Sequence, residues 1–286
     1  MESDIRSCPR GGQPPAPQRL ELRNADFERA RRLIHEIAGI TMGPTKRTMV
    51  ANRLSKRIKE TGHGSFDAYL DAVEAEDSPE RERFTNALTT NLTSFFREAH
   101  HFPILVEHLR RASHKEPFTI WSAACSTGEE PYSIAMALLE AGLPRTFRII
   151  ASDIDTAALE RAQAGIYPAT RAATVGLDRL HRFFQRGEGP YEGLARVRPE
   201  VRALVEFRSV NLHDTAYPIP GPLDAIFCRN AMIYFARPEQ LAVLQRFAPL
   251  IAGRGLLFAG HSENFHYVAG GLLRTRGHTV YETVAA

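Results

Sequence analysis

Apolar residues recur every three or four positions between about residues 24 and 88, the spacing of amphipathic helices. Four helices are expected there, the first from Asn24 and the others over residues 45–61, 65–74 and 80–88. Their inner faces carry Phe27, Ala30, Leu33, Ile34, Ile37, Val50, Leu54, Ile58, Phe66, Tyr69 and Leu70. The pattern predicts a small all-helical domain over residues 21–90, a usual size for a domain.

Beyond residue 90, short apolar runs alternate with helical stretches, which is the pattern of a parallel sheet. Strands are expected over residues 118–123, 147–152, 203–210, 225–228 and 255–259, with helices over 130–141 and 239–251. Residues 272–276 and 278–283 flank Gly277 and predict a closing antiparallel pair. Residues 183–185 and 194–197 flank the turn RGEGPYEG, which predicts a β-hairpin inserted at about 180–203. The fold class is therefore α/β, with a doubly wound sheet over residues 91–286.

Composition limits the class of protein. Hydrophobic residues make up 43% and charged residues 24% of 286 residues, ordinary values for a soluble globular protein of about two domains. Residues 1–20 are rich in proline and glycine and predict a flexible tail. That tail lacks the apolar run of a signal peptide, and no apolar run of about 18 residues follows, so a cytoplasmic protein without membrane insertion is expected.

Charge and cysteine usage exclude two further classes. A formal net charge of +3 is too small to indicate nucleic-acid binding. Three cysteines without C-x-x-C spacing indicate neither a disulfide framework nor a thiolate zinc site.

The stretch from Ile120 to Ser133 reads IWSAACSTGEEPYS. It passes from an apolar strand through small residues to a helix start, an arrangement that exposes backbone amides to a nucleotide. Only one of the three glycines of G-x-G-x-x-G is present, and Glu129 and Glu130 follow at once, so a phosphate would be repelled. A cofactor with a positive centre, such as S-adenosylmethionine, fits better. Two glutamates that merely cap an ordinary helix are the alternative.

Polar side chains follow three further strands, at the edge where ligands bind in this fold class. Asp153 lies 23 residues beyond Glu130, close to the spacing at which an acid meets ribose hydroxyls, although a turn residue would look the same. Asn211 follows the third strand and can offer its amide to an adenine edge. Arg229 and Asn230 follow the fourth.

Residues 88–97, LTTNLTSFFR, join the two predicted domains. A helix junction with a Thr or Asn cap would explain them, but Arg97 could also present a two-pronged donor to a carboxylate in the cleft. Tyr234 is equally open between a core aromatic and a cleft residue.

Residues 260–264, GHSEN, superficially match the hydrolase motif G-x-S-x-G. Asn264 replaces the closing glycine, which excludes that reading. A zinc site from His261, Glu263 and His266 matches no strong spacing either, so no metal is expected.

The chain carries LTTNLTSFFREAHHFP, WSAACSTGEEPYSIA, ASDIDT, GPLDAIFCRNAMIYF and GLLFAGHSENF in this order. Together they resemble the chemotaxis receptor glutamate methyltransferase (CheR) family, over everything but the tail. The resemblance implies a Rossmann-like class I methyltransferase sheet. It also implies methyl transfer from S-adenosylmethionine to glutamates of chemoreceptors, the methyl-accepting chemotaxis proteins, leaving γ-glutamyl methyl esters and S-adenosylhomocysteine. A methyltransferase-like domain that serves as a cofactor-binding sensor or scaffold, or that methylates another protein, is the alternative.

The resemblance also implies roles for individual residues. Cofactor contacts fall on Asn91, Thr93, Arg97, Glu129, Glu130, Asp153, Asn211, Leu212, Arg229 and Asn230. Within the acidic pair, Glu130 rather than Glu129 is expected to face the methionine or ribose portion. Asp153 would take the ribose hydroxyls, and Arg97 and Tyr234 would lie near the methyl group as catalytic residues.

Two surfaces are expected to meet a receptor. The basic helix over residues 45–61, with Arg53, Lys56 and Arg57, would steer acidic receptor helices, although a charged helical face is usually just solvated. The hairpin turn, with Arg186, Gly187 and Gly189, resembles a β-subdomain that adds a receptor's carboxy-terminal peptide as an extra strand. A monomer is expected.

Overall fold

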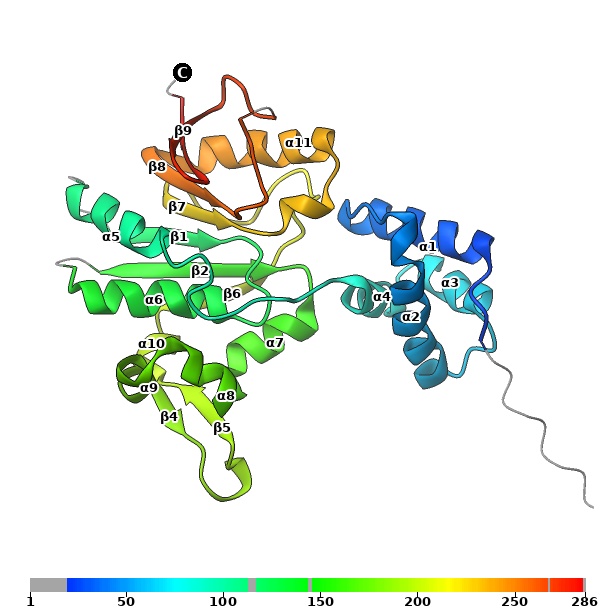
Figure 1. Cartoon of the computed structure of the whole chain (residues 1–286). Coiled ribbons are helices and arrows are strands. Elements are labelled where there is room, and N and C mark those ends of the chain that lie inside the picture. The colour runs from blue at the N-terminus through cyan, green and yellow to red at the C-terminus, as the bar shows by residue number, and fades with distance from the viewer. Residues whose placement is uncertain (1–19, 113–116, 144–145, 267, 285–286) are drawn as a thin grey trace, which may run out of the picture.

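The computed structural model describes residues 20–112, 117–143, 146–266 and 268–284 (Figure 1). The predicted tail, apart from its last residue, lies outside the described residues. Four helices and a short 3-10 turn build the amino-terminal part. They are α1 (Asn24–Ala38), η1 (Pro44–Lys46), α2 (Arg47–Thr61), α3 (Phe66–Glu74) and α4 (Glu80–Leu88).

Capping residues mark some of the ends of these helices. The hydroxyl of Ser65 accepts a hydrogen bond from the Ala68 amide at the start of α3. Gly39 and Gly62 take left-handed conformations just after α1 and α2, where a Cβ would be strained. The second helix begins two residues later than expected, because Pro44 opens a 3-10 turn before it.

A seven-stranded sheet forms the centre of the second part, in the order β6-β2-β1-β7-β8-β10-β9. The five strands from β6 to β8 are parallel, and β10 runs antiparallel to both of its neighbours. The strands are β1 (Phe118–Ser122), β2 (Phe147–Asp153), β6 (Val205–Ser209), β7 (Leu223–Cys228), β8 (Ile251–Ala259), β9 (Leu273–Gly277) and β10 (Val280–Thr283). The doubly wound α/β prediction is confirmed.

Helices cover both faces of this sheet (Figure 1). Alternate residues of β1 enter different cores: Ile120 packs with Tyr132 and Leu105, whereas Trp121 packs with Phe247. The first core lies beneath α5 (His101–Arg111) and α6 (Glu129–Ala141), and the second beneath α11 (Arg237–Phe247). A further helix, α7 (Thr156–Ala164), packs beside β2 and β6. Sequence periodicity missed α5 and α7.

The predicted helix over residues 239–251 ends too late. Helix α11 stops at Phe247, the 3-10 turn η5 (Ala248–Leu250) follows, and Ile251 already opens β8. Pro249 explains the early end, since it lacks the N–H that a continuing helix needs.

The inserted hairpin is part of a larger unit. Strands β4 (Phe184–Arg186) and β5 (Leu194–Val197) pair antiparallel as expected, but β3 (Ile166–Pro168) joins the other side of β5. The insert therefore begins well before the predicted residue 180. Short helical segments complete it: α8 (Ala169–Ala172), η2 (Ala173–Val175), α9 (Leu177–Phe183), η3 (Gly189–Tyr191) and α10 (Pro199–Arg202). We refer to residues 166–202 as the β-subdomain.

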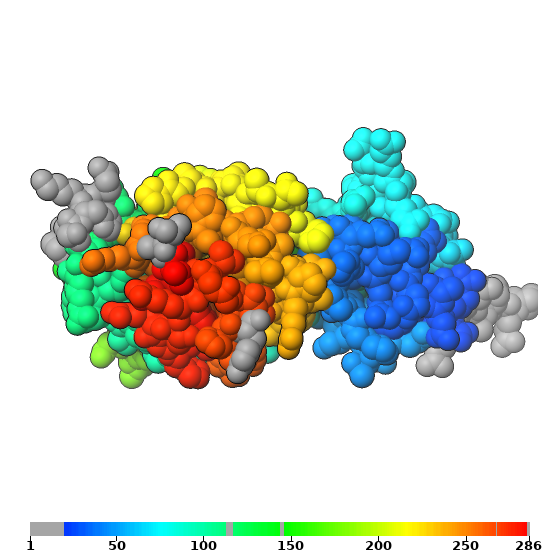
Figure 2. All heavy atoms as spheres, turned by 90° about the horizontal axis from the view of Figure 1, so that it is seen from above, coloured from blue at the N-terminus to red at the C-terminus, as the bar shows by residue number. Residues whose placement is uncertain are grey.

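The end of α1 docks against the sheet domain. The Thr41 amide donates to the Tyr234 carbonyl at 2.8 Å, and the Asn211 side-chain amide donates to the Ile37 carbonyl at 2.7 Å. Gly39 lies in the contact, where a Cβ would be 2.7 Å from His213 Nδ1 and 2.8 Å from Phe235 Cε1. Figure 2 shows the resulting contact between the blue helical domain and the yellow and orange segments of the sheet domain.

Replacing Gly39 with alanine should therefore destabilise the protein more than Gly62→Ala. Both glycines have positive φ, which costs an alanine about 1–2 kcal/mol, but the space around Gly62 is open. The clash at Gly39 should add about 1–3 kcal/mol to the loss of unfolding free energy. Urea unfolding of the two variants measures the difference, and equal losses would mean that the end of α1 is not tightly docked.

Candidate cofactor-binding site

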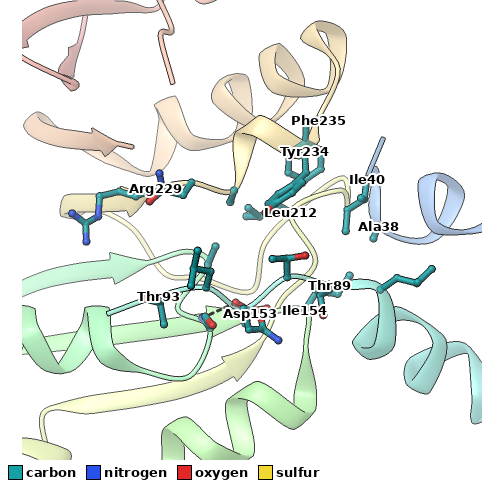
Figure 3. Close-up of a pocket in the computed structure, with 18 of the residues that line it drawn as sticks. Ala38, Ile40, Thr89, Thr93, Asp153, Ile154, Leu212, Arg229, Tyr234 and Phe235 are labelled. Atoms are coloured by element: carbon teal, nitrogen blue, oxygen red, sulfur yellow. Dashed lines mark hydrogen bonds between the residues drawn. The ribbon is translucent and has the colours of Figure 1, made fainter. Parts of the chain in front are cut away.

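A cleft opens at the carboxyl ends of the parallel strands, between the sheet and the helical domain (Figure 3). Strand ends β1, β2, β6 and β7 form one side of it. The other side comes from the segment after α4 and from the end of α1 with the residues beyond it. Of the residues expected at the cofactor or the methyl group, those that line this cleft are Asn91, Thr93, Arg97, Glu130, Asp153, Asn211, Leu212, Arg229, Asn230 and Tyr234.

The small-residue loop after β1 forms the floor of the cleft. Ser126 adopts a left-handed conformation with φ of 50°, and its amide donates to Asp153 Oδ2 at 2.7 Å. Gly128 follows with φ of 93°, and a Cβ there would lie 2.8 Å from the Cβ of Ala162. The Ser126 hydroxyl lines the cleft, is buried and has no hydrogen-bond partner among the described residues. It is therefore available to a ligand.

Asp153 ends β2 with its carboxylate facing the loop. Its two oxygens accept the amides of Ser126 and Asp155 at 2.7 and 3.0 Å. Burial raises the pKa of Asp153 to about 6, even though both amides favour the ionised form. The carboxylate retains lone pairs for hydroxyl donors, the group that a ribose would present.

The two glutamates at the start of α6 face opposite ways. Glu130 lines the cleft and accepts the Ser122 hydroxyl at 2.7 Å and Arg229 Nε at 2.7 Å. Glu129 is fully buried outside the cleft, where it accepts Thr127 and Arg171 of the β-subdomain. Glu129, predicted as a cofactor contact together with Glu130, is thus absent from the lining of the cleft and has Arg171 as its ion-pair partner.

Arg229 is buried behind the cleft and links three elements. Its Nε donates to Glu130, and its Nη1 donates to the Arg97 carbonyl at 2.7 Å. Nη1 also meets His101 Nδ1 at 3.1 Å. Burial, together with the nearby charge of Arg229, lowers the pKa of His101 to about 3, so the ring is neutral and its Nδ1 accepts. Through these bonds Arg229 fixes the positions of the Glu130 carboxylate and the Arg97 backbone.

Arg97 lies between two left-handed residues that are not glycine. Phe96 has φ of 51° and Glu98 has φ of 53°. The Ser133 hydroxyl accepts the Phe96 amide at 2.9 Å, and Glu98 Oε1 accepts both the amide and the ring of His261 at 3.1 Å. Left-handed non-glycine residues are strained, and strain of this kind concentrates at functional sites. These anchors fix the direction in which the Arg97 side chain leaves the backbone.

The cleft fits S-adenosylmethionine by the nature of its donors and acceptors. Buried carboxylates at Glu130 and Asp153 suit positive and hydroxyl groups, and the orphaned Ser126 hydroxyl offers a further bond. No arrangement of three or more His, Cys, Asp or Glu side chains capable of holding a metal occurs among the described residues. No helix in the same residues has the length and apolar character needed to cross a membrane.

The chain matches two family models in sequence order. Residues 25–89 match "CheR methyltransferase, all-alpha domain", and residues 91–279 match "CheR methyltransferase, SAM binding domain". The chain belongs to the CheR methyltransferase family. It is an S-adenosylmethionine-dependent methyltransferase, as the resemblance implied, and the cofactor prediction is confirmed.

Relatives agree over most of the chain. A chemotaxis protein methyltransferase of Salmonella typhimurium is 54% identical over 270 residues, covering 92% of each chain. One of Escherichia coli is 49% identical, again covering 92% of each. A solved rRNA methyltransferase of Streptomyces viridochromogenes aligns with a TM-score of 0.39 and 16% identity, over 68% of this chain and 86% of that one. The last likeness is too low to carry weight.

Two asparagine side chains that were predicted to contact the cofactor of this CheR methyltransferase form hydrogen bonds to other parts of the protein. The Asn91 side chain donates to Asp155 Oδ2 at 2.6 Å, and Thr89 donates to the same oxygen. The Asn211 amide donates to Ile37, and its Oδ1 accepts the His213 amide, so each end of the group has one partner. One N–H and one acceptor lone pair of Asn211 remain for the predicted adenine contact.

Asn230 lies in the loop just after β7, has φ of 59° and depends on Glu263 for its backbone hydrogen bond. Glu263 accepts the amides of Asn230, Met232 and Gly260 at 2.6–2.9 Å. A Cβ at Gly260 would lie 2.3 Å from the Asn230 side chain, so only glycine fits there. Glu263, considered above as a zinc ligand, is instead the anchor of the loop that carries Tyr234.

Some of the positive charge on the basic helix is paired with groups of the same domain. Arg53 donates to the carbonyls that end α4, and Arg57 pairs with Glu60 and Glu80. Lys56, with its side chain 80% exposed, lies 3.9 Å from Glu60. Arg53 and Arg57, both predicted to meet a receptor, therefore also bond within their own domain. Lys46, which precedes this helix, is exposed and lines the cleft.

Gly187 and Gly189 shape the turn of the β-subdomain after Arg186. A Cβ on Gly187 would lie 2.0 Å from the Tyr191 carbonyl oxygen, and Gly189 has φ of 57°. Both positions thus require glycine for the turn itself.

The raised pKa of Asp153 predicts a pH dependence of cofactor-product binding. The ionised carboxylate is the form that accepts ribose hydroxyls, so affinity for S-adenosylhomocysteine should rise as the pH rises through about 6. Calorimetry should show roughly tenfold weaker binding at pH 5 than at pH 7, because about a tenth of the carboxyl is ionised one unit below its pKa.

Asp153→Asn should bind more weakly at pH 7 and lose this dependence. Asp178→Asn, which changes an exposed acid of α9, is the matched control and should behave as the parent. An unchanged pH profile in Asp153→Asn would remove this carboxyl from the ribose site.

Proposed function

We propose that this methyltransferase methylates the side-chain carboxylate of glutamates in the cytoplasmic helices of chemoreceptors, forming γ-glutamyl methyl esters. The names of its relatives support a role in chemotaxis. One structural observation supports the choice of acceptor. Of the two carboxylates that line the cleft, Glu130 is held by Ser122 and Arg229, whereas Asp153 accepts two backbone amides and keeps only the lone pairs assigned above to ribose hydroxyls.

A cleft without a free base suits an acceptor that is already ionised. The remaining charged or phenolic side chains that line it, among the described residues, are Lys46, Arg97, Arg229 and Tyr234; the lining includes no histidine and no further carboxylate. A glutamate has an ordinary pKa of about 4.3 and needs no proton removed, whereas a lysine amine does. This difference favours ester formation over amine methylation.

Catalysis then rests on alignment and electrostatics. S-adenosylmethionine, when bound, supplies a methyl group on a sulfonium leaving group. Arg97 would orient the incoming carboxylate. In support, one of its nitrogens donates to the Leu92 carbonyl at 2.9 Å, and its own carbonyl accepts a hydrogen bond from Arg229. Tyr234 lines the same cleft from η4 (Met232–Tyr234). Holding the acceptor in line contributes through proximity rather than through proton transfer.

Receptor recognition would use two surfaces. Lys46, Lys56 and Lys59 are exposed on η1 and α2 and would steer acidic receptor helices toward the cleft. In the β-subdomain, β4 and β3 are the outer strands beside β5. A receptor's carboxy-terminal peptide would add to an outer strand through main-chain hydrogen bonds, which raises the local enzyme concentration without altering the cleft.

One assay tests the proposed acceptor. The protein is incubated with methyl-labelled S-adenosylmethionine and a receptor cytoplasmic fragment, and the product is treated with alkali. Carboxyl methyl esters should release the label as volatile methanol, whereas methylated amines retain it. The matched control is a fragment whose acceptor glutamates are replaced by aspartate. An alkali-stable label, or equal labelling of the control, would rule out glutamate methylation.

Arg97→Ala should lower turnover about a hundredfold while changing S-adenosylhomocysteine affinity less than about threefold. A charged donor that acts mainly on the reacting groups affects kcat far more than binding. Arg237→Ala removes an exposed arginine just outside the cleft lining and should leave both values unchanged. Equal losses of turnover and affinity in Arg97→Ala would make Arg97 a binding residue only.

A further inference from the structure

A second cleft lies at the opposite edge of the sheet, away from the cofactor site. The amino ends of β1, β2, β7 and β8 form its floor, with the end of α5 and residues of β9 and β10 around it. Its volume is about 910 Å³, within the range of small-molecule sites. In Figure 1 this edge faces away from the helical domain, which lies at the carboxyl edge.

An irregularity of β8 places an arginine in this cleft. Leu223 of β7 pairs with Ile251, but Ala225 pairs with Leu256, so the single residue Asp224 faces four residues, 252–255, of β8. These four read Ala-Gly-Arg-Gly, and Arg254 among them is exposed and lines the cleft. Bulges commonly redirect a side chain toward a functional site.

The bulge has a specific packing requirement. A Cβ on Gly255 would lie 2.7 Å from both the Leu223 carbonyl oxygen and Ile251 Cγ2. Gly253 has nothing within 4 Å of its Cβ position, which leaves that stretch of backbone open. The tight side of the bulge therefore fits glycine alone, and the open side is accessible to a ligand.

Positive charge dominates the lining. Of the residues that the structure describes, four arginines line the cleft: Arg111, Arg148, Arg254 and Arg276. Arg111 pairs with Glu107 on the helix surface. The other three are exposed, and none of them forms an ion pair within the described residues.

The acidic residues of the cleft offset only part of this charge. Asp224 is 7% exposed, and its carboxylate accepts the Thr119 amide. Glu282 pairs with Arg274 at 2.6 Å. Among the described residues, three guanidinium groups thus line one concave site and form no ion pair, which leaves a net positive charge that a bound anion would neutralise.

We infer that this cleft binds a small ligand that bears two or more phosphate groups. Guanidinium groups match phosphate oxygens in pairs, and several of them suit a polyanion better than a single carboxylate. The concave shape favours a small molecule over the convex surface of a duplex. The site is separate from the cofactor cleft, so ligand and cofactor bind together.

Inorganic tripolyphosphate is the probe for this inference, with ATP as a second probe that adds a nucleoside. Calorimetry at about 0.1 M salt should show saturable binding of one tripolyphosphate per chain. Tighter binding of ATP would identify nucleotides as the preferred source of the phosphates, and equal binding would identify the phosphates alone. Absence of saturable binding of both probes would overturn the inference.

Arg254→Ala should weaken tripolyphosphate binding about tenfold, as expected for one charge-assisted contact. Arg254→Lys should recover only part of the loss, because the paired geometry is missing. Arg32→Ala, which removes one charge from a 63% exposed arginine of α1, is the control and should bind as the parent. Equal weakening by Arg32→Ala would show general charge attraction and overturn the inference.

Saturating S-adenosylhomocysteine should leave the tripolyphosphate affinity unchanged. Competition between them would place the polyphosphate in the cofactor cleft and would also overturn the inference. Because the readout is binding at the far edge of the sheet, its failure would not bear on glutamate methylation.

Discussion

The buried ion pair between Arg229 and Glu130 is the contact on which the rest of the cofactor cleft depends. A buried charge is tolerated only when it is paired and its remaining hydrogen bonds are satisfied. Here Glu130 also accepts a hydrogen bond from the Ser122 hydroxyl. Arg229 also donates to the Arg97 carbonyl and to the His101 ring. One pair therefore joins strand ends β1 and β7, the start of α6 and the segment that carries Arg97. Its role is positional, because both partners are occupied before any ligand arrives.

The neutral ring of His101 makes this arrangement possible. A protonated ring would place a second positive charge beside Arg229, and burial of the ring prevents that. Three further carboxylates near the cleft accept hydrogen bonds from backbone amides or side chains of neighbouring loops: Glu98, Glu263 and Asp155. The cleft is thus built by carboxylates that serve the protein, and the groups left for ligands are few: chiefly Arg97, Ser126, Tyr234 and the free lone pairs of Asp153.

Much of this organisation could be predicted from local pattern. Helical spacing in residues 24–88, and apolar runs that alternate with helical stretches beyond residue 90, led to the correct fold class. Burial imposes a period of 3.6 on the helices and makes the central parallel strands apolar on both faces. Helices α5 and α7 were missed. Helix α5 follows the segment around Arg97, which was considered only for its site residues. Helix α7 has nine residues and a weakly amphipathic sequence. Strand β3 was missed because three residues carry too little alternation to be seen.

Within the site, the sequence by itself determined which residue types reach the carboxyl edge, since the strands end where their apolar runs end. It also determined, through the missing glycines and the acid pair, that the loop after β1 does not suit a phosphate. Tertiary structure alone decided what each side chain bonds to. Glu129 pairs with Arg171, and Asn211 donates to the Ile37 carbonyl. Arg53 and Arg57 bond to groups within their own domain. Along the chain, the partners of Arg53, Glu129 and Asn211 are at least 34 residues away, and Glu80 is 23 residues from Arg57. Local sequence patterns do not reveal which distant group will form a hydrogen bond with a polar side chain once water is excluded.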